Sequence, residues 1–201
     1  MTQPQLLSVN TGLAATLLLP QSDQWPRAVQ TGIRKTPVSS LQTPTPVLVR
    51  PLGLEGDEQV DLTVHGGLDK ALYAFCQQHY EPWKRWLTEV GGAADRLETP
   101  GAFGENLTVS GLEERQVFVG DQWVIGEVVL EVTAPRSPCY KFNALMKTAK
   151  AAKQMFLTEE CGWYLRVVQP GSILAGLAIE VRAGARQTNM AQALRLKRPK
   201  N

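Results

Sequence analysis

The sequence predicts a mainly β domain, built as an antiparallel sheet or barrel with a few helices at its periphery. The first observation behind this prediction is a series of short runs rich in β-branched and aromatic residues, spaced about ten residues apart. The second is that turn-forming residues close these runs, and the chain holds 17 glycines and 13 prolines. The third is composition: of 201 residues, 43% are hydrophobic and 20% are charged, which excludes a wholly disordered chain.

Seven segments are predicted as strands from this pattern. They are residues 47–50, 71–75, 116–119, 123–125, 128–133, 163–168 and 177–181. The first of them lies in a stretch, residues 37–51, that contains four prolines. Because proline removes a backbone donor, this stretch is expected to be extended or loop-like, with residues 47–50 as an edge strand.

Two segments carry the spacing of amphipathic helices. In residues 77–90, the side chains Tyr80, Trp83 and Leu87 recur on one face, and a pair of glycines ends the pattern. In residues 143–157, a second apolar face is predicted, and the lysines elsewhere on that helix are expected to face solvent. The members of this second face are Leu145, Ala149, Ala152 and Phe156.

The chain is predicted to be a single barrel domain, residues 1–185, followed by a short basic tail, residues 186–201. The tail could form a helix as far as Pro199. We nevertheless expect a frayed terminus there, because chain ends are often poorly ordered.

Charge and cysteine content exclude several classes of protein. The 21 basic and 19 acidic residues leave a net charge of +2, which argues against a nucleic-acid-binding protein. No apolar run approaches the ~20 residues of a membrane span, and no signal-peptide pattern is present. The three cysteines are widely spaced, so we expect no disulfides and a cytoplasmic location, with Cys76 and Cys161 as buried structural residues. With two histidines in the chain, a zinc site is not favoured.

The strongest chemical signal surrounds Cys139. Pro135 stops a predicted strand, and Pro138 stiffens the loop that presents the thiol. Arg136 precedes the cysteine by three residues and Lys141 follows it by two. Nearby cations favour the thiolate, which attacks electrophiles and binds metals. Cys139 is therefore interpreted as a functional residue.

A second segment, between the predicted strands at 47–50 and 71–75, combines glycines with titratable side chains. It places Asp57, Asp61, His65, Asp69 and Lys70 around four glycines, among them Gly66 and Gly67. Glycine lets backbone N–H groups approach an anion closely, and His65 and Lys70 could neutralise a phosphate. Two alternatives stay open: the aspartates bind a hard cation, although EF-hand spacing is missing, or the polar residues cap turns.

A third segment, residues 101–108, contains Asn106. Its amide can donate and accept hydrogen bonds at once, which suits the edge of a heterocycle. A turn in which the asparagine bonds within the protein explains the same pattern equally well.

Together these segments resemble the MOSC domain, the C-terminal domain of molybdenum-cofactor sulfurase, which also occurs as stand-alone bacterial proteins. The matching stretches are residues 31–38, 53–73, 101–107, 119–121, 131–141 and 162–167. The resemblance is closest to the stand-alone branch that reduces 6-N-hydroxylaminopurine. It implies a distorted antiparallel β-barrel of the MOSC type and a molybdenum–pterin cofactor (molybdopterin).

The same resemblance assigns roles to particular residues. Cys139 would be the sulfur ligand of the molybdenum, or a carrier of sulfur. The cations that would line the pocket for the anionic pterin phosphate are Lys35, His65, Lys70, Arg136 and Lys141. The other residues predicted to bind the cofactor are Asp57, Gly66, Gly67 and Asn106. Close relatives carry a three-helix region after the barrel that this chain is expected to lack, so its substrate and electron-donor surface could differ.

Two functions follow from the resemblance. In the first, an enzyme reduces the N–OH bond of a small hydroxylamine-type substrate. Its electrons would come from an external reductase, because no GxGxxG dinucleotide fingerprint is present. In the second, Cys139 carries a persulfide and passes its sulfur to a metal centre elsewhere. A third interpretation, a cysteine hydrolase that pairs Cys139 with His65 or His79, has no local signature to support it.

Overall fold

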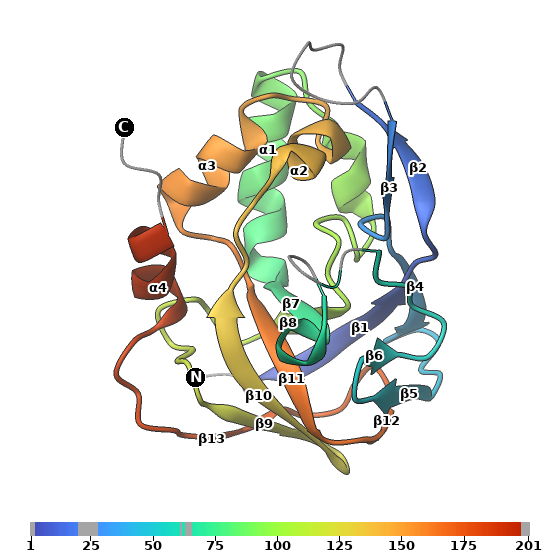
Figure 1. Cartoon of the computed structure of the whole chain (residues 1–201), viewed down its shortest axis with the longest axis vertical. Coiled ribbons are helices and arrows are strands. Elements are labelled where there is room, and N and C mark those ends of the chain that lie inside the picture. The colour runs from blue at the N-terminus through green and yellow to red at the C-terminus, as the bar shows by residue number, and fades with distance from the viewer. Residues whose placement is uncertain (1–2, 20–27, 61, 63–65, 198–201) are drawn as a thin grey trace.

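The computed structural model describes residues 3–19, 28–60, 62 and 66–197, in which an eight-stranded sheet curls strongly into a half-barrel (Figure 1). The order of its strands is β13-β9-β10-β11-β7-β8-β1-β4. In chain order they are β1 (Gln5–Thr11), β4 (Thr36–Ser40), β7 (Leu72–Cys76), β8 (Leu107–Ser110), β9 (Gln122–Ile125), β10 (Val128–Pro135), β11 (Trp163–Gln169) and β13 (Glu180–Arg182). Across the described chain, neighbouring strands pair antiparallel apart from β7 and β8, which run parallel. The predicted mainly β, barrel-like fold is confirmed.

Two small sheets flank the large one. The first has the order β12-β5-β6 and joins Gly171–Ile173, Val47–Arg50 and Gly53–Leu54, while the second pairs β2 (Ala15–Leu18) with β3 (Ala28–Thr31). The predicted strand at 47–50 exists as β5, but it is the central strand of its sheet and not an edge. The prolines at 46 and 51 flank this strand without interrupting it, so its N–H groups can pair on both sides.

Alternating side chains of the strands fill the inside of the curled sheet. On β10, Val128, Leu130 and Val132 are fully buried, whereas the residues between them are half-exposed. Trp123 of β9 and Trp163 of β11 meet edge to face, with ring centroids 5.5 Å apart. Each such apolar side chain stabilises the fold by about 1.5–3 kcal/mol when buried. This rigid core fixes the strand ends from which the functional loops leave.

A second core lies between the sheet and the helices. Helix α1 (Tyr80–Glu89) follows a 3-10 turn at Gln77–His79, and it buries Tyr80, Trp83 and Leu87 as predicted. These residues pack against Phe75 and Phe103, whose rings stack at 3.9 Å. None of the described helices has the length and apolar character that crossing a membrane requires.

The helix predicted over residues 143–157 is in fact two short helices, α2 (Tyr140–Leu145) and α3 (Ala151–Thr158). The break falls at Lys147, whose φ of 51° is left-handed, and Asn143 Oδ1 then accepts a hydrogen bond from Ala152 N at 2.7 Å. Ala149 of the predicted apolar face is exposed, and Met155 is buried instead. The lysines do face solvent as predicted, at positions 147, 150 and 153.

Three other expectations about the secondary structure are corrected. Residues 116–119 form no strand, because the carboxylate of Asp121 accepts a hydrogen bond from Phe118 N and holds a turn. The strand expected at 177–181 is shorter and lies at Glu180–Arg182. The prediction of a frayed tail is wrong for Met190–Lys197. These residues form helix α4, and Met190 is buried in the core.

Gly162 provides a test of this architecture, because it lies where β11 begins and has a φ of +62°. A Cβ at this position would lie 2.2 Å from the carbonyl oxygen of Ala74. We predict that Gly162→Ala lowers the free energy of unfolding by more than about 3 kcal/mol in urea denaturation. Gly91 is the matched control, since it also has a positive φ (70°) but nothing within 4 Å of a Cβ. Gly91→Ala should lose only about 1–2 kcal/mol, and equal losses for the two variants would contradict the contact.

Candidate active site

A pocket brings together loops that are far apart in the sequence. Seven of the residues predicted to form the site line it: Lys35, Asp57, Lys70, Asn106, Arg136, Cys139 and Lys141. Gly66 and Gly67 do not belong to the lining. His65 lies outside the described residues. The predicted residues thus largely share one cavity, while the roles assigned to them remain predictions.

Cys139 differs from the other two cysteines in its exposure. Cys76 and Cys161 are fully buried, as predicted, and burial raises the pKa of Cys76 to about 12 and that of Cys161 well above its ordinary value. Both therefore stay protonated and unreactive at neutral pH. Cys139 is half-buried, lies directly between β10 and α2 in extended backbone, and lines the pocket. A ligand in the pocket can reach this thiol.

Arg136 places a buried positive charge beside that thiol. The residue is 4% exposed, and its guanidinium carbon lies 4.6 Å from the ring centroid of Phe142 and 5.1 Å from that of Tyr73. Burial opposes its charge, but Tyr73, Tyr164 and Cys139 together raise the pKa of Arg136, so it remains a cation. Within the described part of the chain, no carboxylate lies within ion-pair distance of it. A buried cation held by aromatic rings without a carboxylate favours an anionic ligand.

Lys35 is the opposite case, because a carboxylate compensates its charge. Its Nζ is hydrogen-bonded to Asp57 Oδ1, and the two side chains are 7% and 3% exposed. Asp57 Oδ1 also accepts a hydrogen bond from Gly12 N at 2.9 Å, and Oδ2 accepts one from Asn106 Nδ2 at 2.9 Å. The alternative in which Asp57 and Asp61 bind a hard cation is not tested, because Asp61 lies outside the described residues. Lys35 therefore offers less net charge to a ligand than Arg136 does.

The side chain of Asn106 bonds within the protein, as the second interpretation of this segment expected, while its contact with a heterocycle stays a prediction. Its Nδ2 donates to Asp57 and to the carbonyl of Asn10, and its Oδ1 accepts a hydrogen bond from Tyr73 N at 3.1 Å. Both N–H bonds of the amide are therefore used within the protein. Asn106 therefore positions Asp57 and Tyr73, at the start of β7, beside the pocket.

The glycine pair also differs from its predicted role. Gly67 N donates to Gln59 Oε1 at 2.9 Å, and a Cβ on Gly66 would lie 2.5 Å from that same oxygen. The Gly67 N–H is therefore not available to cradle an anion. What the glycines do allow is the close approach of Gln59, with a φ of 87° at Gly67 just before the short turn Leu68–Lys70. That turn carries Lys70 to within 5.7 Å of the ring centroid of Tyr164.

Two lining residues, Tyr73 and Tyr164, were not singled out from the sequence. They are directly paired across β7 and β11, and their ring centroids are 5.7 Å apart. Tyr73 Oη donates to the carbonyl of Cys161 at 2.9 Å, and burial raises the pKa of both tyrosines. The available signal was a tyrosine, with its polar tip, near the start of each of two predicted strands. They give the pocket an aromatic wall on which Arg136 and Lys70 lie.

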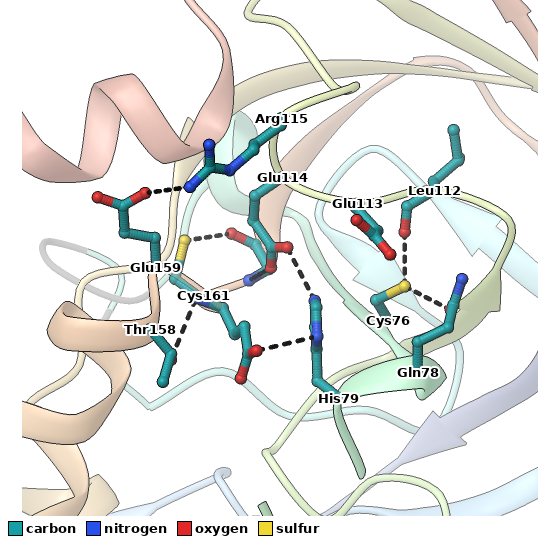
Figure 2. A network of polar contacts seen from close by, with 12 residues as sticks. Cys76, Gln78, His79, Leu112, Glu113, Glu114, Arg115, Thr158, Glu159 and Cys161 are labelled. Carbon is teal, nitrogen blue, oxygen red and sulfur yellow. Dashed lines mark hydrogen bonds and ion pairs between the residues drawn. The ribbon is translucent and has the colours of Figure 1, made fainter. Parts of the chain in front are cut away.

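A second network of polar contacts surrounds His79 and Glu114 (Figure 2). His79 Nε2 is 2.9 Å from Glu114 Oε2, and His79 Nδ1 is 3.6 Å from Glu160 Oε1. Glu114 Oε1 accepts a hydrogen bond from Gly162 N, and the carbonyl of Gly162 accepts one from Arg136 N. His79 does not belong to the pocket lining, so its pairing with Cys139 in a hydrolase is not supported. The network instead supports the backbone of Arg136.

Comparison with known proteins identifies the family. A model of the MOSC domain matches residues 61–180, more than half of the chain. The chain belongs to the MOSC domain family. It is 39% identical to protein YiiM of Escherichia coli (strain K12) over 144 residues, which cover 72% of this chain and 62% of YiiM. It is also 34% identical over 137 residues to a protein of Gibberella moniliformis named "Reductase", covering 68% of this chain and 24% of that protein.

The fold gives the same family relationship. The crystal structure of YiiM from Geobacillus stearothermophilus matches this MOSC chain with a TM-score of 0.72 and 30% sequence identity, over 96% of this chain and 83% of that one. The chain spans less than two thirds of the length of the E. coli and Gibberella relatives. The chain therefore shares the family and the fold of these relatives, but the matches to the E. coli and Gibberella proteins cover only part of those proteins.

The network of His79 predicts how stability depends on pH. Burial opposes its charge, but the hydrogen bond to Glu114 and the charges of Glu114 and Glu160 raise the pKa of His79. A histidine whose pKa is raised in the folded state stabilises the fold through its charge. This contribution is present in full below pH ~6.5, the ordinary histidine pKa, and is lost as the pH rises through the pKa of the folded state. His79→Gln should therefore lose about 2 kcal/mol of unfolding free energy at pH 5.5 and clearly less at pH 9.

The measurement is urea denaturation of both proteins at the two pH values. Arg182→Gln serves as the control, because Arg182 is exposed and pairs only with the exposed Glu180 among the described residues. It should change stability little at either pH. A loss for His79→Gln that is equal at both pH values, or larger at pH 9, would contradict a charged His79.

Proposed function

We propose that this MOSC chain binds a molybdenum–pterin cofactor in the pocket and reduces the N–OH group of a small hydroxylamine-type substrate. The observation that carries the proposal is the half-buried thiol of Cys139 in the same cavity as Arg136, a buried cation with no described carboxylate partner. Membership of the MOSC family and the likeness to a protein named reductase support it. The physiological substrate class we favour is N-hydroxylated base analogues such as 6-N-hydroxylaminopurine.

The residues present fit such a cofactor in two respects. A cysteine thiolate is a soft ligand, suited to a molybdenum centre that is already rich in sulfur. The pterin phosphate needs cations, and Arg136, Lys70 and Lys141 line the same cavity. Lys35 contributes less to this, because Asp57 already compensates its charge. We therefore assign Cys139 the role of metal ligand. Arg136, Lys70 and Lys141 are assigned the binding of the pterin phosphate.

The overall reaction consumes two electrons and two protons. The hydroxylamine R–NH–OH becomes R–NH₂ and water as the N–O bond breaks. When bound, the molybdenum cofactor supplies the two-electron chemistry, and a separate reductase supplies the electrons. The protein holds the cofactor through Cys139, orients the substrate against Tyr73 and Tyr164, and provides protons at the pocket wall. We propose no nucleic-acid or membrane partner.

The proposal is tested on protein made in a host that synthesises the cofactor. Wild-type protein should hold molybdenum and reduce 6-N-hydroxylaminopurine with an artificial electron donor. Cys139→Ser should lower the molybdenum content by at least about tenfold and abolish turnover, because a hydroxyl is a poor substitute for the soft ligand. Cys76→Ser is the matched control, since this buried thiol lies outside the pocket, and it should keep both properties.

Two results would contradict the proposal. Fully loaded wild-type protein that does not turn over the substrate would exclude this reductase activity. Cys139→Ser protein that keeps its molybdenum would exclude the thiol as the ligand. The alternative, a sulfur carrier, predicts instead a Cys139 adduct with the mass of one additional sulfur atom and no bound pterin, which mass spectrometry of the intact protein detects.

A further inference from the structure

The amine of Lys35 occupies an unusual position for a surface-loop lysine. The residue lies between β3 and β4, yet its side chain is 7% exposed and its Nζ is hydrogen-bonded to Asp57. It lines the same pocket as Cys139. Because Asp57 compensates its charge, Lys35 is poorly suited to hold the anionic part of a ligand.

Asp57 does not depend on Lys35 for its position. Gly12 N donates to Oδ1 at 2.9 Å, and Asn106 Nδ2 donates to Oδ2 at 2.9 Å. Asn106 is itself fixed by the backbone N–H of Tyr73. These donors hold the carboxylate in place when Lys35 changes its protonation state. A proton can therefore leave Lys35 and return to it without rearrangement of the wall.

The electrostatics of the pocket also favour proton release from Lys35. Burial lowers the pKa of Lys35, and the charges of Asp57 and Glu105 oppose this only in part. Two other polar groups of the same pocket hold their protons, because burial raises the pKa of Tyr73 and of Tyr164. Arg136 stays charged and cannot serve as an acid.

We propose that Lys35 is the proton donor of the reduction, and that Asp57 positions its ammonium toward the pocket. This rests on the proposed function. The Lys35 Nζ–H bond breaks as its proton passes to the hydroxyl oxygen of R–NH–OH, the N–O bond breaks, and the oxygen leaves as water. The separate electron-donor reductase supplies the two electrons, and solvent supplies the second proton, which goes to the nitrogen. Solvent then reprotonates the neutral Lys35 amine, which stays hydrogen-bonded to Asp57.

Two substitutions separate proton donation from charge. Lys35→Arg keeps a cation beside Asp57 but cannot release a proton at neutral pH, and Lys35→Met removes both. Both variants should hold as much molybdenum as wild type, with kcat lowered at least about 100-fold and a much smaller change in KM. In wild type, kcat should fall at high pH as Lys35 loses its proton, and this fall should be absent from both variants. Lys153→Arg and Lys153→Met are matched controls on the exposed face of α3 and should behave as wild type.

A second readout needs neither cofactor nor turnover. In ¹³C-labelled, cofactor-free protein, the Cε signal of Lys35 is identified by its loss in Lys35→Arg and followed as a function of pH. We expect it to titrate below ~10.4, the ordinary lysine value, because burial lowers the pKa of Lys35. Lys35→Arg keeps this test available if Lys35→Met does not fold.

The outcomes distinguish this proposal from the proposed function. If loaded wild-type protein is active while both Lys35 variants keep the wild-type kcat and pH profile, Lys35 is not the donor and the reductase function stands. A Lys35 signal that titrates at or above the ordinary lysine value would also overturn the role of Lys35. If loaded wild-type protein is inactive, the reductase function fails and the proposal for Lys35 fails with it.

Discussion

The carboxylate of Asp57 is the contact on which the pocket depends. It accepts hydrogen bonds from Gly12, Lys35 and Asn106, which come from three separate parts of the chain. Through Asn106 it is also tied to the backbone of Tyr73 at the start of β7. A buried charge that lost these donors would be strongly destabilising, so the loops are constrained to meet here. The cavity forms where these loops meet around the carboxylate of Asp57, beside the ends of strands β1, β7 and β8.

The two buried cations of the pocket have different surroundings, so the net positive charge is distributed unevenly across the cavity. Lys35 is compensated by Asp57, whereas the charge of Arg136 is shared with the rings of Tyr73 and Phe142. An anion is therefore favoured near Arg136, whereas Lys35, whose charge Asp57 compensates, is the group that we propose for proton transfer. Cys139 shares the pocket with both. Cofactor binding and proton supply can thus be assigned to different parts of one cavity.

The sequence predicted what depends on local signals and missed what depends on distant partners. Cys139, which lines the pocket, could be singled out because its prolines and cations are its neighbours in the chain. Most strands could be predicted because runs of β-branched and aromatic residues end at turn-forming residues. The sequence could not decide between the two interpretations of Asn106, because the carboxylate that accepts a hydrogen bond from its amide, that of Asp57, comes from another loop. The long helix predicted over residues 143–157 was wrong because periodicity does not reveal the left-handed turn at Lys147. The tail was expected to fray because burial of Met190 depends on a surface formed by the rest of the fold.

The central claim is that the sulfur of Cys139 binds molybdenum in this pocket, and X-ray absorption at the molybdenum edge tests it most directly. Protein purified with its cofactor should show the dithiolene sulfurs of the pterin and one further sulfur at bonding distance. Protein in which Cys139 has been alkylated before the cofactor is loaded should lack that further sulfur. A spectrum with no sulfur beyond the dithiolene pair in the unmodified protein would contradict the account.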